Sequence, residues 1–194
     1  MARPREFDEA AALDAAVRCF WAKGYEGVSV RELAASMGIA GASLYNAFGD
    51  KQALYQRALA RYVEQSFQDR MRRFEGLPPG QAISAFFDEI IARSLADEQR
   101  QGCMLVNSVF ECALHDDAAQ VPIVEVVKQI EAFFRRCVEA GQADGTITSV
   151  QTAEDLARLL LGTLMGIRAL ARLGPERERL EGIVRPIVSL LARE

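Results

Sequence analysis

The 194-residue sequence is poor in the residues from which metal and catalytic sites are built. It has one histidine, His115, and four cysteines at irregular positions, no two of them spaced as CxxC. Because zinc and other transition metals need clustered Cys and His ligands, we expect no metal and no cofactor. There is also no Ser-His-Asp set and no Gly-rich phosphate loop, so the sequence offers nothing on which to build an enzyme.

Long apolar runs are missing as well. No run approaches the roughly 20 residues that cross a bilayer, and the start, MARPREFDEA, has no apolar signal segment. We therefore expect a soluble, cytoplasmic protein with no membrane partner. Half of the residues are apolar, which is enough to bury a substantial core.

Apolar residues recur at helical spacing along most of the chain, and no strand alternation, repeat or low-complexity tract interrupts them. The pattern predicts an all-α fold. Gly and Pro between residues 76 and 80 mark a boundary. Pro122 and Pro186 predict a late start for one helix and a kink in another. The predicted helices cover about 7–23, 29–37, 40–48, 50–74, 81–97, 103–114, 117–141, 152–173 and 175–192.

The most informative segment runs from Val28 to Lys51. Ser29 followed by Glu32 forms a capping box that starts a short helix, and Gly38 permits a sharp turn into a second one. In that second helix Leu44 and Phe48 face inward, because they are four residues apart. The residues left to the side or facing outward are Gly41, Ala42, Ser43, Tyr45 and Asn46. This arrangement indicates a helix-turn-helix that reads DNA.

Residues 12–54 resemble the TetR/AcrR family of bacterial transcriptional regulators. The matching motifs are Lys-Gly-Tyr at 23–25, Ser-Val-Arg-Glu-Leu-Ala at 29–34, Gly-Ile at 38–39, Ser-Leu-Tyr at 43–45 and Phe-Gly-Asp-Lys at 48–51. The resemblance implies a three-helix DNA-binding domain over residues 1–49. It also implies a ligand-binding and dimerisation domain over residues 50–194, with the helix from 50 to 74 connecting the two.

The resemblance further implies that Tyr45 and Lys51 bind phosphate. Ser29 lies at the other helix start and is a further phosphate candidate, whereas Ser43 and Asn46 are candidates for base contacts, with simple solvation as the alternative. Where the family commonly has a polar, basic pair, this chain has Ala40-Gly41, which removes a capping hydroxyl. The arm Arg3-Pro4-Arg5 reaches the minor groove or is only a disordered tail. The full predicted DNA-contacting set is Ser29, Arg31, Gly41, Ala42, Ser43, Tyr45, Asn46 and Lys51.

The net charge of −4 is unevenly distributed. Residues 1–62 contain eight Lys/Arg and seven Asp/Glu, a balance of +1, whereas the remainder carries 15 and 20, a balance of −5. A nearly neutral DNA-binding end predicts contact with few phosphates and a modest salt dependence per subunit.

The remaining helices are expected to dimerise and to hold an effector. Residues 152–173 carry Gly162 and Gly166 on an apolar helix, which favours pairing across a two-fold axis, with closure of the monomer core as the alternative. For the effector, Glu111 and Arg168 are informative, because buried charges need a partner; a structural pair between them is equally open. The predicted ligand-binding set is Phe86, Phe87, Met104, Asn107, Ser108, Glu111, Phe134, Met165 and Arg168.

Cys103, at a predicted helix start, is a candidate for thiol sensing, because a helix N-terminus favours the thiolate. A plain apolar helix opening explains the same residues. We therefore expect a ligand-responsive homodimeric repressor that binds a palindromic double-stranded DNA operator. The alternatives are a helical small-molecule-binding protein without specific DNA recognition, and a regulator that senses oxidants or electrophiles through Cys103.

Overall fold

The structure is a computed structural model that describes residues 7–112 and 117–192. These residues form helices and no strand, apart from an isolated antiparallel bridge between Ile147 and Ala192, so the all-α prediction is confirmed. The elements are α1 (Glu9–Lys23), α2 (Val30–Met37), α3 (Gly41–Phe48), α4 (Lys51–Val63), the π-helical turn η1 (Glu64–Gln68), α5 (Asp69–Phe74), α6 (Pro79–Leu95), α7 (Met104–Cys112), α8 (Asp117–Asp144), α9 (Ala153–Ala171) and α10 (Arg177–Leu191).

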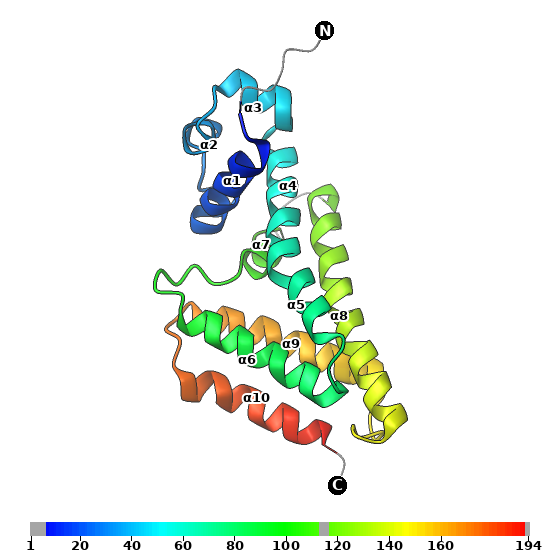
Figure 1. Cartoon of the computed structure of the whole chain (residues 1–194). Coiled ribbons are helices and arrows are strands. Elements are labelled where there is room, and N and C mark those ends of the chain that lie inside the picture. The colour runs from blue at the N-terminus through cyan, green and yellow to red at the C-terminus, as the bar shows by residue number, and fades with distance from the viewer. Residues whose placement is uncertain (1–6, 113–116, 193–194) are drawn as a thin grey trace.

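Figure 1 shows three parts. The head, α1 to α3, lies at one end; the connecting helix, α4-η1-α5, leads away from it beside α8; and α6, α9 and α10 lie across the far end. Helix α7 sits between the head and the far helices. We call α6 to α10 the body.

Helix ends in the head follow local chemistry. Asp8 and Asp50 accept backbone N–H groups at the starts of α1 and α4. At α2, Ser29 and Glu32 form the predicted capping box, and Gly38 ends the helix in the left-handed region with φ 67°. The predicted start and stop residues of the helix-turn-helix are therefore confirmed.

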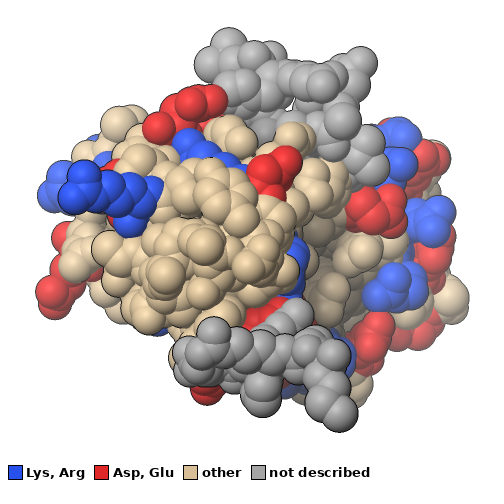
Figure 2. Space-filling view, turned by 90° about the horizontal axis from the view of Figure 1, so that it is seen from above, with Lys and Arg blue, Asp and Glu red and all other residues tan. Residues whose placement is uncertain are grey.

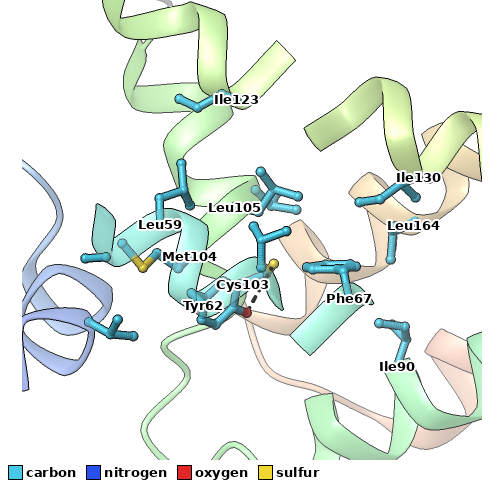
Figure 3. Packing of buried hydrophobic residues seen from close by; sticks show 14 of the residues in the cluster. Leu59, Tyr62, Phe67, Ile90, Cys103, Met104, Leu105, Ile123, Ile130 and Leu164 are labelled. Carbon is cyan, nitrogen blue, oxygen red and sulfur yellow. Dashed lines mark hydrogen bonds between the residues drawn. The ribbon is translucent and has the colours of Figure 1, made fainter. Parts of the chain in front are cut away.

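The connecting helix contacts the head on one side and the body on the other. Arg61 donates to both carboxylate oxygens of Asp14 on α1, at 2.8 and 3.1 Å. Its hydrogen bonds and charge hold the pKa of Asp14 below the usual range. On the other side, Leu59, Tyr62 and Phe67 pack against α7, α8 and α9 (Figure 3). The same buried cluster therefore continues from the head into the body.

Two sequence expectations differ from the structure. The helix predicted from 50 to 74 occupies the expected place, but η1 interrupts its α-helical hydrogen bonding at residues 64–68. Helix α8 begins at Asp117, ahead of Pro122, so its predicted late start is wrong. Among the described residues, none of the helices combines the length and the apolar composition that a membrane span requires.

Candidate nucleic-acid interface and effector cavity

Helix α3 presents one face to the core and one to solvent. Leu44 and Phe48 are buried, as the spacing predicted. On the other face Tyr45 is 54% exposed, and Gly41, Ala42 and Asn46 are also exposed, while Ser43 is half-buried. An exposed aromatic ring beside an amide on a short helix leaves donors and acceptors available to a partner surface.

The N-terminus of α3 lacks a side-chain cap, as expected from the sequence. Ala40 has the extended backbone of an N-cap, with φ −69° and ψ 148°, but it offers no side-chain hydrogen bond. Backbone N–H groups at this end therefore face outward without a capping hydroxyl.

Three further predicted DNA-contacting residues lie at the starts of the neighbouring helices α2 and α4. Ser29 is held by its capping box, with its hydroxyl donating to Glu32 at 2.8 Å, and Arg31 is exposed next to it. Lys51 opens α4 and places its ammonium 4.5 Å from the centroid of the Tyr25 ring. That contact fixes the position of the cation at a helix N-terminus, where anions are favoured.

Glu32 connects this region to α1. Lys23 donates to its carboxylate at 2.7 Å. This bond and those from Ser29 lower the pKa of Glu32 to about 2. Seen from above, the described residues at this end of the molecule show a broad uncharged area with scattered Lys and Arg beside Asp and Glu, and no single basic stripe (Figure 2).

Helix α7 touches both the head and the connecting helix. Glu111 accepts the backbone N–H of Tyr25 at 3.0 Å, and Ser108 shares a 2.5 Å hydrogen bond with the hydroxyl of Tyr55. Gly24 makes this approach possible, because a Cβ there would lie 2.5 Å from Glu111 Oε1, and its φ of 73° disfavours other residues. Both α7 residues were predicted to line an effector cavity; here Glu111 joins the body to the head, and Ser108 joins it to the connecting helix.

The other predicted ligand residues are mostly packed in the core. Phe86, Phe87 and Phe134 form an aromatic cluster with ring centroids 5.0 to 5.9 Å apart, and each is completely buried. Met104 is buried and Met165 is half-buried against the same core. Large apolar side chains at helical spacing suit a core and a cavity lining equally, which is why the sequence did not separate the two.

Asn107 and Arg168 have protein partners. Asn107 donates to the carbonyl of Gln101 and accepts from Arg172. Arg168 donates to Ser94 Oγ at 2.8 Å and to the carbonyl of Gly102 at 2.6 Å. The structural pair of Glu111 with Arg168 does not form, because each group is engaged elsewhere.

Arg168 also lines a cavity of about 300 Å³ between the head, the connecting helix and the body. It is the one member of the predicted ligand set in this lining. The side of the connecting helix contributes Arg70, which is 1% exposed and which the sequence analysis missed. Its spacing from Phe67, one turn earlier on the buried face, was the available signal. The lining comprises Trp21, Tyr62, Ser66, Phe67, Arg70, Ile90, Arg93, Ala96, Asp97, Gly102 and Arg168.

Cys103 was predicted at a helix start and lies one residue ahead of α7, but it is 1% exposed. The Tyr62 hydroxyl donates to its Sγ at 3.4 Å (Figure 3). Burial raises the pKa of Tyr62 well above its ordinary value, so the phenol stays a neutral donor. In the described residues no group of three or more His, Cys, Asp and Glu is arranged to hold a metal ion. His115 and the Arg3-Pro4-Arg5 arm lie outside the described residues.

Comparison with known proteins places this geometry in a family. The profile described as bacterial regulatory proteins, tetR family, matches residues 12–58, and that of the tetracyclin repressor-like C-terminal domain matches residues 79–187. The uncharacterized HTH-type transcriptional regulator YezE of Bacillus subtilis is 31% identical, with 98% of this chain and 100% of YezE covered.

Two further relatives agree. The HTH-type transcriptional repressor ComR of Escherichia coli is 28% identical over 92% of this chain and 86% of its own. A cysteine mutant of the TetR family transcriptional regulator CifR, solved with 26-base-pair operator DNA, is 31% identical, covers 98% of this chain and 100% of its own, and superposes with a TM-score of 0.85. The chain therefore belongs to the TetR family of bacterial transcriptional regulators.

Proposed function

We propose that this regulator is a homodimeric, effector-responsive repressor that inserts α3 into the major groove of a palindromic operator. The observation that carries the proposal is the outward face of α3, with Tyr45 and Asn46 exposed above a buried Leu44 and Phe48. The CifR mutant, which matches this chain over nearly its whole length, was solved on operator DNA.

The exposed residues divide by chemistry. Tyr45, Lys51 and Arg31 have donors suited to phosphate oxygens, which position a protein on the duplex. Ser29 has its hydroxyl and its backbone N–H both donating to Glu32, so it supports the start of α2 beside these donors. Asn46 and Ser43 have groups that read base edges, and Asn pairs with adenine through two hydrogen bonds. Gly41 and Ala42 add no bulk, so the end of α3 approaches the DNA closely. With few cations on this face, we expect a shallow salt dependence.

The dimer surface follows from α9 and α10. Five residues at helical spacing along α9 and the turn after it are exposed or half-buried in the single chain: Leu159, Gly162, Gly166, Leu170 and Leu173. A Cβ added at Gly162, Gly166 or Gly182 would meet nothing within 4 Å. Small residues flanked by exposed leucines allow a second copy to pack closely, and two heads can then reach successive major grooves about 34–36 Å apart.

Effector response is proposed to travel through the connecting helix. This helix lines the cavity and is tied to α1 by Arg61 and to α7 by Tyr55. A small shift of the helix changes the separation of the two heads and hence operator affinity. If the helix is crosslinked to α7 through engineered cysteines, we expect effector-induced release to disappear; intact release would contradict the mechanism.

We propose two domains: residues 1–49 form the DNA-binding domain, and residues 50–194 form the effector and dimerisation domain. We assign the chain no catalytic role and propose the cytoplasm as its location, where the bacterial chromosome lies. The thiol-sensing alternative needs an accessible thiolate, and Cys103 is buried.

The test is selection of binding sites from random double-stranded DNA. We expect an enriched palindrome whose binding is weakened by Lys51→Ala for all sequences and relaxed by Asn46→Ala at one base position. Lys128→Ala is the control, because it removes the same charge from an exposed position on α8. No enrichment above nonspecific binding would favour a ligand-binding protein without specific DNA recognition.

A further inference from the structure

The cavity has a chemical preference that its packing does not satisfy. Among the described residues, four buried side-chain nitrogen or oxygen atoms have no hydrogen-bond partner: Trp21 Nε1, Arg70 Nε, Arg70 Nη1 and Arg168 Nε. All four are N–H donors, and all three residues line this cavity. Buried donors left without acceptors destabilise a fold, and charged ones most of all, so an acceptor group is expected there.

The charge of the lining is positive. Glu89 pairs with Arg70 at 3.2 Å, but it also pairs with Arg73 and Arg93. Arg168 donates only to the neutral groups of Ser94 and Gly102, and no carboxylate in the described ranges lies within ion-pair distance of it. Burial, together with the charges of Arg93 and Arg168, lowers the pKa of Arg70 despite the opposing effect of Glu89.

One carboxylate also lines the cavity. Asp97 accepts the backbone N–H of Gly102 at 2.7 Å, so it supports the loop that precedes α7. The lining therefore holds three guanidiniums, those of Arg70, Arg93 and Arg168, and a single acid that already has a backbone partner.

The remaining walls are apolar and aromatic. Trp21 and Tyr62 meet edge to face at 5.2 Å between ring centroids, and Phe67 and Ile90 continue the apolar surface. The volume of about 300 Å³ lies at the lower end of the ~300–1,000 Å³ of small-molecule pockets. The size, the apolar walls and the unpartnered cationic donors of the lining residues together fit a small amphipathic anion.

We propose that this cavity binds a small organic carboxylate, whose carboxylate accepts from Arg70, Arg168 and Trp21 and whose apolar part packs on the aromatic walls. The proposal rests on the proposed function, because such a ligand would be the effector. The ligand touches the head through Trp21 on α1 and the connecting helix at η1, where a π-helical turn already departs from regular hydrogen bonding. The ligand therefore contacts both the head and the connecting helix, and the relative position of these two parts sets the distance between the two heads of the dimer.

The chain offers a direct readout, because Trp21 is its single tryptophan. Straight-chain and phenyl-substituted carboxylates, from propanoate to 4-phenylbutanoate, are titrated at constant ionic strength while Trp21 emission is recorded. Each is paired with its neutral primary amide, and inorganic phosphate tests whether any anion suffices. We expect saturable changes for at least one carboxylate, with affinity at least tenfold above that of its amide.

Variants test whether carboxylate binding depends on the cavity residues or on general electrostatic attraction. Arg70→Met and Arg168→Gln should each weaken carboxylate binding at least tenfold. Arg73→Met is the matched control: it pairs with the same Glu89 and changes the same charge, but lies outside the cavity lining, so affinity should hold. Arg70→Met should keep or raise Tm, because it removes unpaired donors while Glu89 retains Arg73 and Arg93.

The proposal is overturned if amides bind as tightly as carboxylates, if no carboxylate changes Trp21 emission or Tm, or if Arg73→Met loses as much affinity as Arg70→Met. A Tm strongly lowered by Arg70→Met would instead make this arginine structural and also overturn it. The titration needs no DNA, so saturable carboxylate binding without operator binding would refute only the regulator, and the converse would refute only the anion site.

Discussion

Restoring a cap to α3 should stabilise the head. Ala40 already has N-cap backbone angles, and its carbonyl accepts the Leu44 N–H at 3.0 Å, so only the side-chain acceptor is missing. Ala40→Ser supplies that acceptor at an exposed position without disturbing the core. An N-cap hydroxyl contributes about 1 kcal/mol, within a range of roughly 0.5–2.

For a chain of this length, ~1 kcal/mol corresponds to a rise in Tm of about 2–4 °C. The assay is thermal and urea unfolding followed by circular dichroism, with Ala35→Ser as the matched control. Ala35 is exposed within α2, where the same substitution lowers helix propensity and should reduce stability by a few tenths of a kcal/mol. Opposite signs at the two positions support the cap argument; no stabilisation by Ala40→Ser, or equal effects at both sites, would refute it.

Three other substitutions probe the dimer surface, the junction of head and body, and the capping box. Leu159→Glu on the proposed dimer surface should convert the dimer to a monomer, measured by light scattering. Leu77→Glu, at a position equally exposed at 40%, should leave the protein dimeric. If both variants are dimers, the proposed dimer surface is wrong. Glu111→Ala removes the acceptor of the Tyr25 N–H and should lower the free energy of unfolding in urea by about 1–3 kcal/mol. An unchanged urea midpoint would show that this contact does not stabilise the junction of head and body. Glu32 has a lowered pKa, so its contribution to stability is complete above about pH 4.5 and is lost as the pH falls toward 2. The Tm difference between wild type and Glu32→Gln should therefore narrow between about pH 4.5 and 2. A constant Tm difference would contradict the stabilising role of the Glu32 carboxylate.

The sequence was sufficient wherever structure depends on near neighbours. Capping by Ser29 and Glu32, the turn at Gly38 and the inward face of Leu44 and Phe48 involve residues within a few positions of one another. Local hydrogen bonding and helical periodicity determine such features, so they can be predicted without knowledge of the tertiary structure.

The lining of the proposed effector cavity could not be predicted from the sequence in this way. Glu111 meets Tyr25 across 86 positions, and Arg168 meets Gly102 across 66. Which of many apolar residues line a space, and which fill the core, depends on how distant helices pack. Arg70 carried a partial signal, since a charged residue on the buried side of the connecting helix needs a partner.

Recognition of one operator by two α3 helices is tested most directly by a hydroxyl-radical footprint of wild type and Leu159→Glu on the selected DNA. We expect wild type to protect two half-sites about 34–36 Å apart, and the variant to lose both together. A single protected site, or protection that is unchanged by Leu159→Glu, would contradict the account.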